Sequence, residues 1–125
     1  MGSGGAWKCN FCGYEVGVGG PFEFYRDDKG QRKTYGHPVP SSKEAEEAGI
    51  KGFFELAYCP TCDKVQDVIL VEFATPKDYF GAWSSIGKIK LQCPDCGEKL
   101  YKYLENLQCS RCRKGFFKLK MLWFS

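Results

Sequence analysis

Short apolar runs, separated by turn signals, dominate the chain, and most of them have the length and two-residue period of a strand. Residues 53–58 and 65–73 are apolar runs of this kind. Between residues 21 and 35, phenylalanines alternate with polar residues around the turn signal Asp27-Asp28-Lys29-Gly30, which predicts a β-hairpin. We predict further strands at 88–92, 99–104 and 115–124, and therefore a mostly β fold.

The last predicted strand, 115–124, has the clearest alternation. Its apolar positions are Phe117, Leu119, Met121 and Trp123, which alternate with Lys118, Lys120, Leu122 and Phe124. One face is therefore expected to be apolar throughout, and the other turns apolar only at its end. The apolar end, 121–124, suits a protein interface or the edge of a dimer.

Helical signals are few and short. Ser41 and Glu44 fit a capping box before a helix at 43–48, and Gly49 is a suitable C-cap. Thr75-Pro76 predicts the start of a helical turn that continues through Phe80. Gly17 to Pro21 predicts a break in the chain, and 81–87, with two glycines and two serines, is the best linker candidate.

The candidate chemistry lies in the cysteines. All eight fall into four C-x-x-C pairs: Cys9/Cys12, Cys59/Cys62, Cys93/Cys96 and Cys109/Cys112. Two intervening residues let the chain turn so that both sulfurs approach one ion, and a second pair completes a tetrahedron of thiolates. Disulfides or free buried thiols are the alternative. The regular spacing of all four pairs favours two metal ions, and zinc in particular.

The residue after each second cysteine often needs a positive φ. Gly13 and Gly97 meet this need without strain, and Asp63 tolerates it better than most residues. Arg113 is the least suited of the four, although Gly115 is close by.

Four turns can share two ions in three ways. Sequential pairing joins Cys9, Cys12, Cys59 and Cys62 on one ion and the other four cysteines on the second. Interleaved pairing joins the first turn to the third, and nested pairing joins the first to the fourth. Only 12 residues separate Cys96 from Cys109, so closing that loop costs little, and we favour sequential pairing.

Two resemblances follow from these turns. Residues 93–112 resemble a four-cysteine zinc ribbon, and residues 9–14 with 59–62 resemble the two metal turns of rubredoxin. The second resemblance implies a mononuclear iron site for electron transfer at Cys9, Cys12, Cys59 and Cys62. No family with an assigned activity is recognised over the full chain.

The expected architecture is a tandem of rubredoxin-like and zinc-ribbon lobes. Residues 1–80 form the first lobe, in which 17–52 is a small α+β insertion made of a hairpin and a short helix. Residues 88–125 form the C-terminal ribbon. Lobes of this size need a metal to supplement a small core, and structural zinc supplies roughly 10–16 kcal/mol in finger peptides.

The charge and the targeting signals of the chain exclude few classes of function. The formal net charge of +3 becomes −1 when two zinc tetrathiolate centres each contribute −2. Residues 88–125 nevertheless hold nine Lys/Arg against three Asp/Glu.

The start, Met1 to Gly5, has no signal-peptide features and is given no function, and no segment is long and apolar enough to span a bilayer. We therefore expect a reducing, cytoplasmic environment and no membrane partner.

No catalytic pattern is visible. Eight cysteines make two full sets of four, which leaves no coordination position open for water or substrate. His37, the single histidine, suits a loop residue that caps backbone better than a catalytic group. A thiol oxidoreductase at Cys59-Pro-Thr-Cys62 would need a following helix, whereas 65–73 is a strand pattern.

We therefore expect a zinc-stabilised binding or adaptor module that contacts protein or nucleic acid. The rubredoxin-type iron protein is the second hypothesis. Basic residues lie among Tyr101, Tyr103, Phe116 and Phe117, which suits backbone neutralisation with base stacking; the bland alternative is a half-buried strand with lysines facing outward. The basic candidates for nucleic-acid contact are Lys99, Lys102, Arg111, Arg113, Lys114, Lys118 and Lys120.

Overall fold

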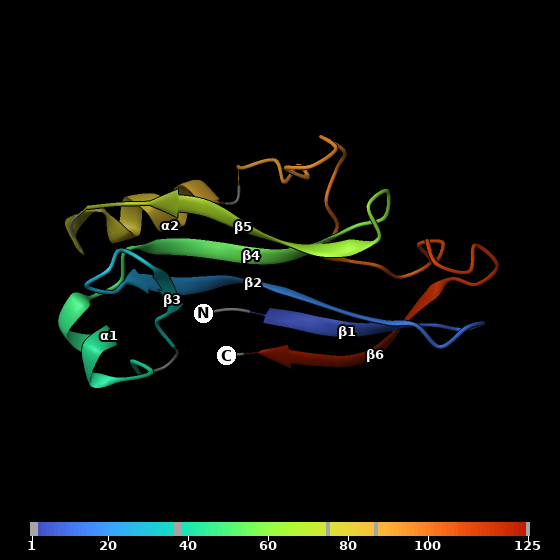
Figure 1. Cartoon of the computed structure of the whole chain (residues 1–125), viewed down its shortest axis with the longest axis horizontal. Helices are drawn as coiled ribbons and strands as arrows, with labels where there is room; N and C mark the ends of the chain where they lie inside the picture. The colour runs from blue at the N-terminus through green and yellow to red at the C-terminus, as the bar shows by residue number, and fades with distance from the viewer. Residues whose placement is uncertain (1–2, 37–38, 75, 87, 125) are drawn as a thin grey trace.

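The protein is built around one antiparallel sheet of six strands (Figure 1). The computed structural model describes residues 3–36, 39–74, 76–86 and 88–124. Five strands lie in the order β5-β4-β2-β1-β6, and β3 pairs with β2. The strands are β1 (Ser3–Cys9), β2 (Glu15–Arg26), β3 (Arg32–Thr34), β4 (Gly52–Cys59), β5 (Lys64–Glu72) and β6 (Phe117–Phe124). Two helices, α1 (Lys43–Ala48) and α2 (Tyr79–Ile86), and a 3-10 turn, η1 (Pro76–Asp78), complete the described elements. The predicted mostly β class is confirmed.

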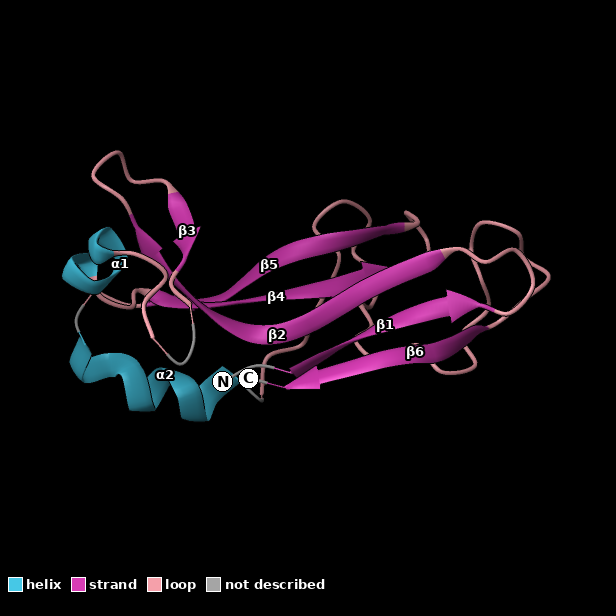
Figure 2. Ribbon diagram, turned by 90° about the horizontal axis from the view of Figure 1, so that it is seen from below, coloured by secondary structure: helices cyan, strands magenta, loops and turns pink. Residues whose placement is uncertain are grey.

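The two ends of the sheet differ (Figure 2). The helices and β3 lie at one end, whereas the turn between β1 and β2, the turn between β4 and β5 and the loops around 93–96 and 109–112 gather at the other. The four C-x-x-C turns belong to this second end.

His37 lies outside the described residues, so its predicted capping role stays a prediction. None of the described helices has the length and apolar character that spanning a membrane requires.

The longest strand, β2, crosses the predicted break at Gly17 to Pro21. Val16 and Val18 alternate as buried side chains, as expected for a strand with one face in the core. Another backbone comes close at Gly19, because a Cβ there would lie 2.9 Å from the carbonyl oxygen of Ser3. The strand continues through this segment, so the predicted break was wrong, although the pairing of β2 with β4 shifts register between Gly19 and Phe22.

The predicted hairpin and first helix are confirmed with small shifts. Phe24 pairs with Thr34 across β2 and β3, and Asp27 begins the turn by accepting the N–H of Gly30 at 2.9 Å. Helix α1 has the predicted bounds, but its N-cap is Ser42 instead of Ser41, because the Ser42 hydroxyl accepts the N–H of Ala45. Gly49 is the C-cap, with a φ of 75°.

The predicted linker at 81–87 was wrong over its described residues, because Gly81 to Ile86 belong to α2. The apolar residues of this segment recur at the 3.6-residue period of a helix. Tyr79, Ala82, Trp83 and Ile86 pack with Phe53 of strand β4 and with Phe73, the residue that follows β5. The Phe53 ring lies 5.4 Å from the ring of Trp83 and 5.3 Å from that of Tyr79. The glycine and serines lie between these packed positions.

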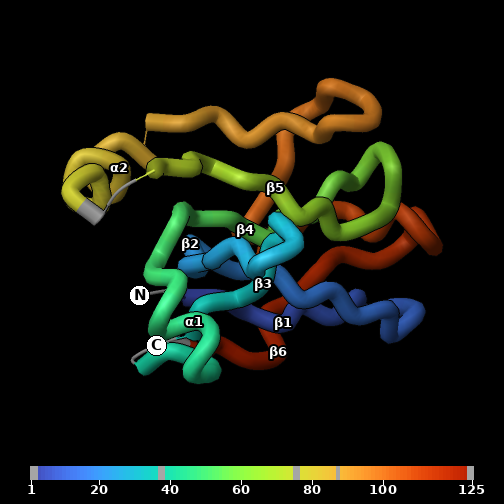
Figure 3. The backbone as a smooth tube through the Cα atoms, turned by 60° about the vertical axis from the view of Figure 1, so that its left-hand side comes forward, coloured from blue at the N-terminus to red at the C-terminus, as the bar shows by residue number. Residues whose placement is uncertain are grey.

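The predicted strands at 88–92 and 99–104 were also wrong. Only isolated bridges form in this segment, between Gln92 and Lys99 and between Tyr101 and Tyr58 of β4. In Figure 3 the orange part of the chain runs along the β5 side of the sheet before turning toward the C-terminal strand. The segment is therefore a loop that covers the sheet without joining it as a strand.

The C-terminal strand β6 forms an edge of the sheet and pairs with β1. Its register shifts between Ala6 and Trp7, so that Lys120 is an extra residue in β6. The shift reverses the alternation beyond it. Leu119 and Leu122 therefore share a face, and Met121 and Trp123 lie on the other, which corrects the single apolar face predicted from alternation.

Strand β6 also joins the two predicted lobes, because it belongs to 88–125 and pairs with β1 of 1–80. Buried side chains of the described residues form three clusters. One contains Trp7, Val18, Tyr58, Leu104 and Phe117 together with Cys9 and Cys109. A second contains Ala57 and Leu100 with Cys59 and Cys93, and the third lies under α2. The division into separately folding units stays a prediction.

Gly4 offers a test of the packing of β1 against β6. A Cβ at this position would lie 2.4 Å from the Trp123 indole and 2.6 Å from the carbonyl oxygen of Val18. We expect Gly4→Ala to lower the free energy of unfolding by about 1–3 kcal/mol, as overpacking does in other cores. Gly17→Ala is the control, because a Cβ there meets nothing within 4 Å. Urea denaturation of the metal-loaded variants measures the difference, and equal stabilities would contradict this packing.

Candidate metal centres

The eight cysteines form two separate groups of four at the turn-bearing end of the sheet. Centre A consists of Cys9, Cys12, Cys109 and Cys112. Centre B consists of Cys59, Cys62, Cys93 and Cys96. Within each centre the four sulfurs lie within 4.8 Å of one another, and all eight cysteines are free of disulfides.

The spacing of the sulfurs matches a tetrathiolate site. At centre A the Sγ atoms of Cys9 and Cys112 are 3.6 Å apart, and those of Cys12 and Cys109 are 3.8 Å apart. At centre B the corresponding distances are 3.5 Å for Cys59 and Cys96 and 3.9 Å for Cys62 and Cys93. Four thiolates about 2.3 Å from a zinc ion would lie roughly 3.8 Å apart, whereas a disulfide needs about 2.05 Å. The donor sets therefore fit metal ions.

Each C-x-x-C turn has the backbone that the sequence predicted. The residue after each second cysteine has a positive φ: 81° at Gly13, 53° at Asp63, 78° at Gly97 and 58° at Arg113. At Gly13, Gly97 and Arg113 the N–H of this residue donates to the carbonyl oxygen of the first cysteine of its turn, at 2.8 to 3.1 Å. Amide groups also face the sulfurs, since the N–H groups of Phe11 and Cys62 lie 3.4 Å from Cys9 and Cys59.

The pairing of the turns is nested, so the preferred sequential pairing was wrong. The first turn meets the fourth because β1 and β6 are antiparallel neighbours, and the N–H of Asn10 donates to the carbonyl oxygen of Phe116 at 3.0 Å. The second turn meets the third because Tyr58 and Tyr101 exchange backbone hydrogen bonds of 2.8 and 2.9 Å. Closing about 97 residues instead of 12 costs only about 2 kcal/mol more. Strand pairing and burial of Phe117 outweigh a penalty of that size.

Both family resemblances are corrected at the level of the ligand set. The rubredoxin-like set Cys9, Cys12, Cys59 and Cys62 is not assembled, and the iron site expected there is not formed. The turns at 93–96 and 109–112 likewise serve different centres. Instead, each centre takes two cysteines from the tip of a hairpin, β1–β2 or β4–β5, and two from a C-terminal turn. Each is therefore a zinc-ribbon-like arrangement of two turns.

Within each centre the thiols differ in acidity. Burial favours the neutral thiol of Cys93, but the N–H groups of Asp95 and Cys96 outweigh it and lower its pKa to about 6. The N–H of Lys114 likewise lowers the pKa of Cys112 to about 6. Cys96 raises the pKa of Cys62 to about 12. A cation that binds four thiolates must displace the remaining protons, so metal affinity rises with pH.

Gln66 is a functional residue that the motif analysis missed. Its side chain is buried, and its amide Nε2 lies 3.3 Å from Cys93 Sγ and 2.9 Å from a carboxylate oxygen of Asp95. Asp95 also pairs with Lys64 at 2.5 Å. The signal in the sequence is a polar residue in phase with the inward-facing Val68 and Leu70. Gln66 orients the third turn and donates to its thiolate.

A second set of contacts joins the two centres. Asp63, next to Cys62 of centre B, accepts the Tyr58 hydroxyl at 2.7 Å and pairs with Arg111 at 3.6 Å. Arg111 lies between the cysteines of the fourth turn, and its guanidinium lies 3.8 Å from the centroid of the Tyr14 ring. Tyr58 is fully buried and packs edge-on against Phe117 at 5.6 Å. The centres therefore share side chains.

Gly115 is required where the fourth turn meets the first. A Cβ on Gly115 would lie 2.5 Å from Cys9 Sγ and 2.6 Å from the Phe11 Cβ. The nearby φ of 58° belongs to Arg113, so the need for glycine at 115 is a matter of close approach.

The basic candidates divide into two groups. Four of the seven pair with carboxylates: Lys102 with Glu55, Arg111 with Asp63, Lys118 with Glu105 and Lys120 with Glu15. Among the described residues no carboxylate pairs with Lys99, Arg113 or Lys114. Lys114 lies with Phe11 at centre A, its ammonium 5.5 Å from the ring centroid. Nucleic-acid contact by these residues stays a prediction.

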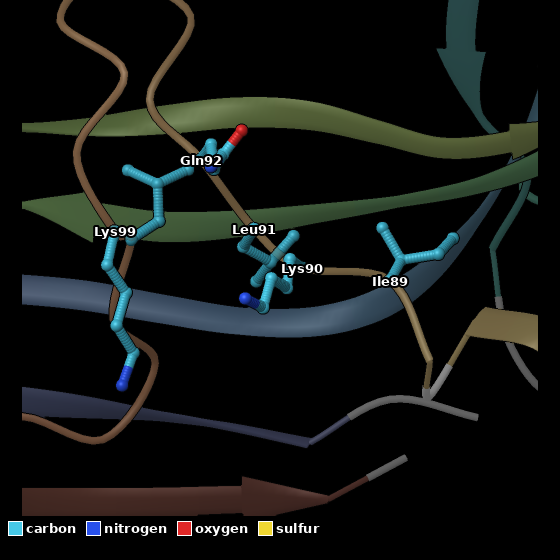
Figure 4. A pocket seen from close by; sticks show the side chains of 6 residues that line it. Ile89, Lys90, Leu91, Gln92 and Lys99 are labelled. Carbon is cyan, nitrogen blue, oxygen red and sulfur yellow. The ribbon is translucent and has the colours of Figure 1, made fainter.

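Lys99 lies apart from the other basic candidates, beside a pocket of about 560 Å³ (Figure 4). The pocket is lined by the two arms that flank the third turn, where the N–H of Leu100 donates to the carbonyl oxygen of Leu91 at 3.1 Å. Lys90 and Lys99 both line it. The Lys99 ammonium lies 4.9 Å from the centroid of the Tyr101 ring.

The carboxylates of Asp27, Asp28 and Glu44 also lie close together. Asp27 Oδ1 accepts the N–H groups of Lys29 and Gln31 at 2.9 and 2.8 Å, and its other oxygen pairs with Lys33. These contacts stabilise the turn and explain the position of the Asp27 carboxylate.

Comparisons with known proteins define no family for this chain. No protein-family model matches it, and no curated protein and no solved structure is significantly similar to it. The class that the structure defines is therefore a mostly β protein with two tetracysteine centres.

Double cysteine variants test the nested pairing. Cys9 and Cys109 share centre A, so C9S/C109S is expected to leave centre B intact and to bind one Co²⁺ per chain with the spectrum of a tetrathiolate. C9S/C59S is the matched control, because it removes one ligand from each centre and is expected to leave no intact tetrathiolate. Sequential pairing requires the opposite result. Titration with Co²⁺, followed by visible absorption, distinguishes the two.

Proposed function

We propose that this protein is a zinc-stabilised binding module without catalytic activity, which contacts single-stranded nucleic acid through the tip of centre A. The tip is defined as Phe11, Arg113, Lys114 and Phe116. The observation that supports the contact is the exposure of Phe11 and Phe116 at centre A, with the Lys114 ammonium 5.5 Å from the Phe11 ring. Arg113 precedes Lys114 in the chain, and neither has a carboxylate partner among the described residues.

A stabilising role for the metals is supported by the ligand count. Each centre offers four thiolates at distances that fill a tetrahedron, whereas a catalytic zinc keeps one position for water or substrate. The first cysteine of each turn is at least nine-tenths buried and belongs to a hydrophobic cluster, whereas Cys12 and Cys96 are exposed. Zinc bound here replaces part of the core that so short a chain cannot build.

The tip is rigid and exposed at once. Phe11 is 65% exposed and Phe116 is 44% exposed, which is unusual for large apolar side chains next to a buried ligand. The Asn10 side chain accepts the N–H of Phe116 at 3.0 Å and fixes the two turns relative to each other. Flat rings for base stacking, together with cations for the phosphates, suit a single strand.

The metal itself can be tested first. Elemental analysis of the native protein is expected to give two zinc ions per chain, because tetrathiolate sites favour zinc in a reducing environment. Removal of zinc by a chelator is expected to abolish the cooperative thermal transition. Iron in place of zinc, or a melting curve unchanged after metal removal, contradicts this role.

The contact can be tested with a fluorescent oligothymidylate on the zinc-loaded protein. We expect F11A to weaken binding by about 1–3 kcal/mol, the loss of one stacked base. F80A is the control, because Phe80 on α2 is 80% exposed and lies away from the tip. R113Q/K114Q is expected to reduce the slope of log affinity against log salt by about 1.4, or about 0.7 for each phosphate contact.

Lys77, on the 3-10 turn η1, provides the matched charge control, and K77Q is expected to leave the slope unchanged. A slope near zero for the native protein, or equal loss in F11A and F80A, overturns nucleic-acid contact. The exposed tip would then be a protein contact.

A further inference from the structure

The buried indole of Trp7 has a hydrogen-bond donor without an acceptor. Trp7 is 2% exposed, and its Nε1 atom is buried without a hydrogen-bond partner in the described part of the chain. A buried N–H in this condition is rare, because leaving the group unpaired costs the desolvation free energy of a donor. The donor therefore calls for an acceptor from outside the chain.

The indole borders a pocket of about 180 Å³, here called the glycine pocket. Part of its wall is backbone without side chains, at Gly4, Gly5 and Gly19. A Cβ on Gly5 would lie 3.3 Å from Trp7 Nε1 and 3.2 Å from the carbonyl oxygen of Met121. The space that the missing side chain leaves next to Nε1 is narrow, because an added Cβ would be closer to the indole than an ordinary contact. The pocket exceeds the roughly 10–15 Å³ that one water needs.

The walls of the pocket indicate the kind of ligand. The Tyr103 ring meets the Trp7 indole edge-on at 5.2 Å and is itself 73% exposed. Lys102 lines the pocket, and its ammonium is paired with the buried carboxylate of Glu55 at 2.7 Å. Its charge is compensated, so the pocket favours a neutral acceptor over an anion. Bare backbone beside an aromatic ring suits a flat group.

We propose that the glycine pocket binds a planar amide group, whose carbonyl oxygen accepts the Trp7 indole N–H. The amide belongs either to a small free molecule or to a peptide segment of a partner, and the chemistry at Trp7 is the same in both cases. The site lies at the start of β1, whereas Cys9 of centre A lies at its end, so the proposal does not depend on nucleic-acid contact (Figure 2).

The test is an NMR titration of the zinc-loaded protein with N-methylacetamide, and with acetate as an anion of similar size. We expect a saturable shift of the Trp7 indole N–H and of the Gly5 and Gly19 amides with N-methylacetamide, and at least tenfold weaker binding of acetate. A blocked triglycine that binds more tightly than N-methylacetamide identifies a peptide ligand. Equal affinity identifies a small amide.

Gly5→Ala is expected to abolish the shifts by filling the space beside Nε1. Gly17→Ala, where a Cβ meets nothing within 4 Å, is expected to leave them unchanged. Trp7→Phe keeps an aromatic ring but removes the donor, and is expected to weaken binding about fivefold, as the loss of one neutral hydrogen bond does. The absence of a saturable shift, with only water contacts at the indole, overturns the proposal, as does tighter binding of acetate or equal binding by Gly5→Ala.

Discussion

The convergence of four thiolates at each centre is the constraint on which the rest of the structure depends. No strand or helix of the described chain lies between α2 and β6, so residues 88–116 form loops, yet Leu100 and Leu104 within them are buried. Two turns of this segment supply half of each centre. Structural zinc contributes roughly 10–16 kcal/mol in finger peptides, which is comparable to the whole net stability of a domain, about 5–15 kcal/mol. A metal ion bound with that free energy would be sufficient to order residues 88–116, in which the described chain forms no strand or helix.

The nested arrangement makes the two centres parts of one folded end. The ion pair between Asp63 and Arg111 connects them, but Arg111 is largely exposed, and such pairs contribute about 0–1 kcal/mol. Tyr58 connects them more strongly, because it precedes Cys59 of centre B while its ring packs against Phe117 beside centre A. Burial of a large aromatic ring contributes about 1.5–3 kcal/mol. The shared core, more than the surface charges, should make loading of one centre favour the other.

Local patterns in the sequence predicted the hairpin around Gly30, strands β4, β5 and β6, helix α1 and the positive φ after each cysteine pair. Features that depend on tertiary contacts could not be read in the same way. The glycines of β2 look like a break until Ser3 is known to lie against them. Gly81 and the two serines of α2 mask a helical period that is evident once Phe53 is known to pack against Trp83. The cysteine pairing depends on which strands are neighbours, and loop length discriminates too weakly to decide it.

Strand β6 is an edge of the sheet, and its bulge and charged side chains affect whether it can pair with another chain. An unpaired edge strand tends to add further strands unless charge or a bulge prevents it. In β6 the extra residue Lys120 pairs with Glu15, and the Glu105 carboxylate accepts the N–H of Leu119 at 3.1 Å. The first half of the edge is therefore closed by side chains of the protein itself. Met121 and Leu122 remain more than half exposed beyond the bulge. A dimer through this strand, as predicted from its apolar end, would have to use that second half, next to the glycine pocket and far from the metal centres.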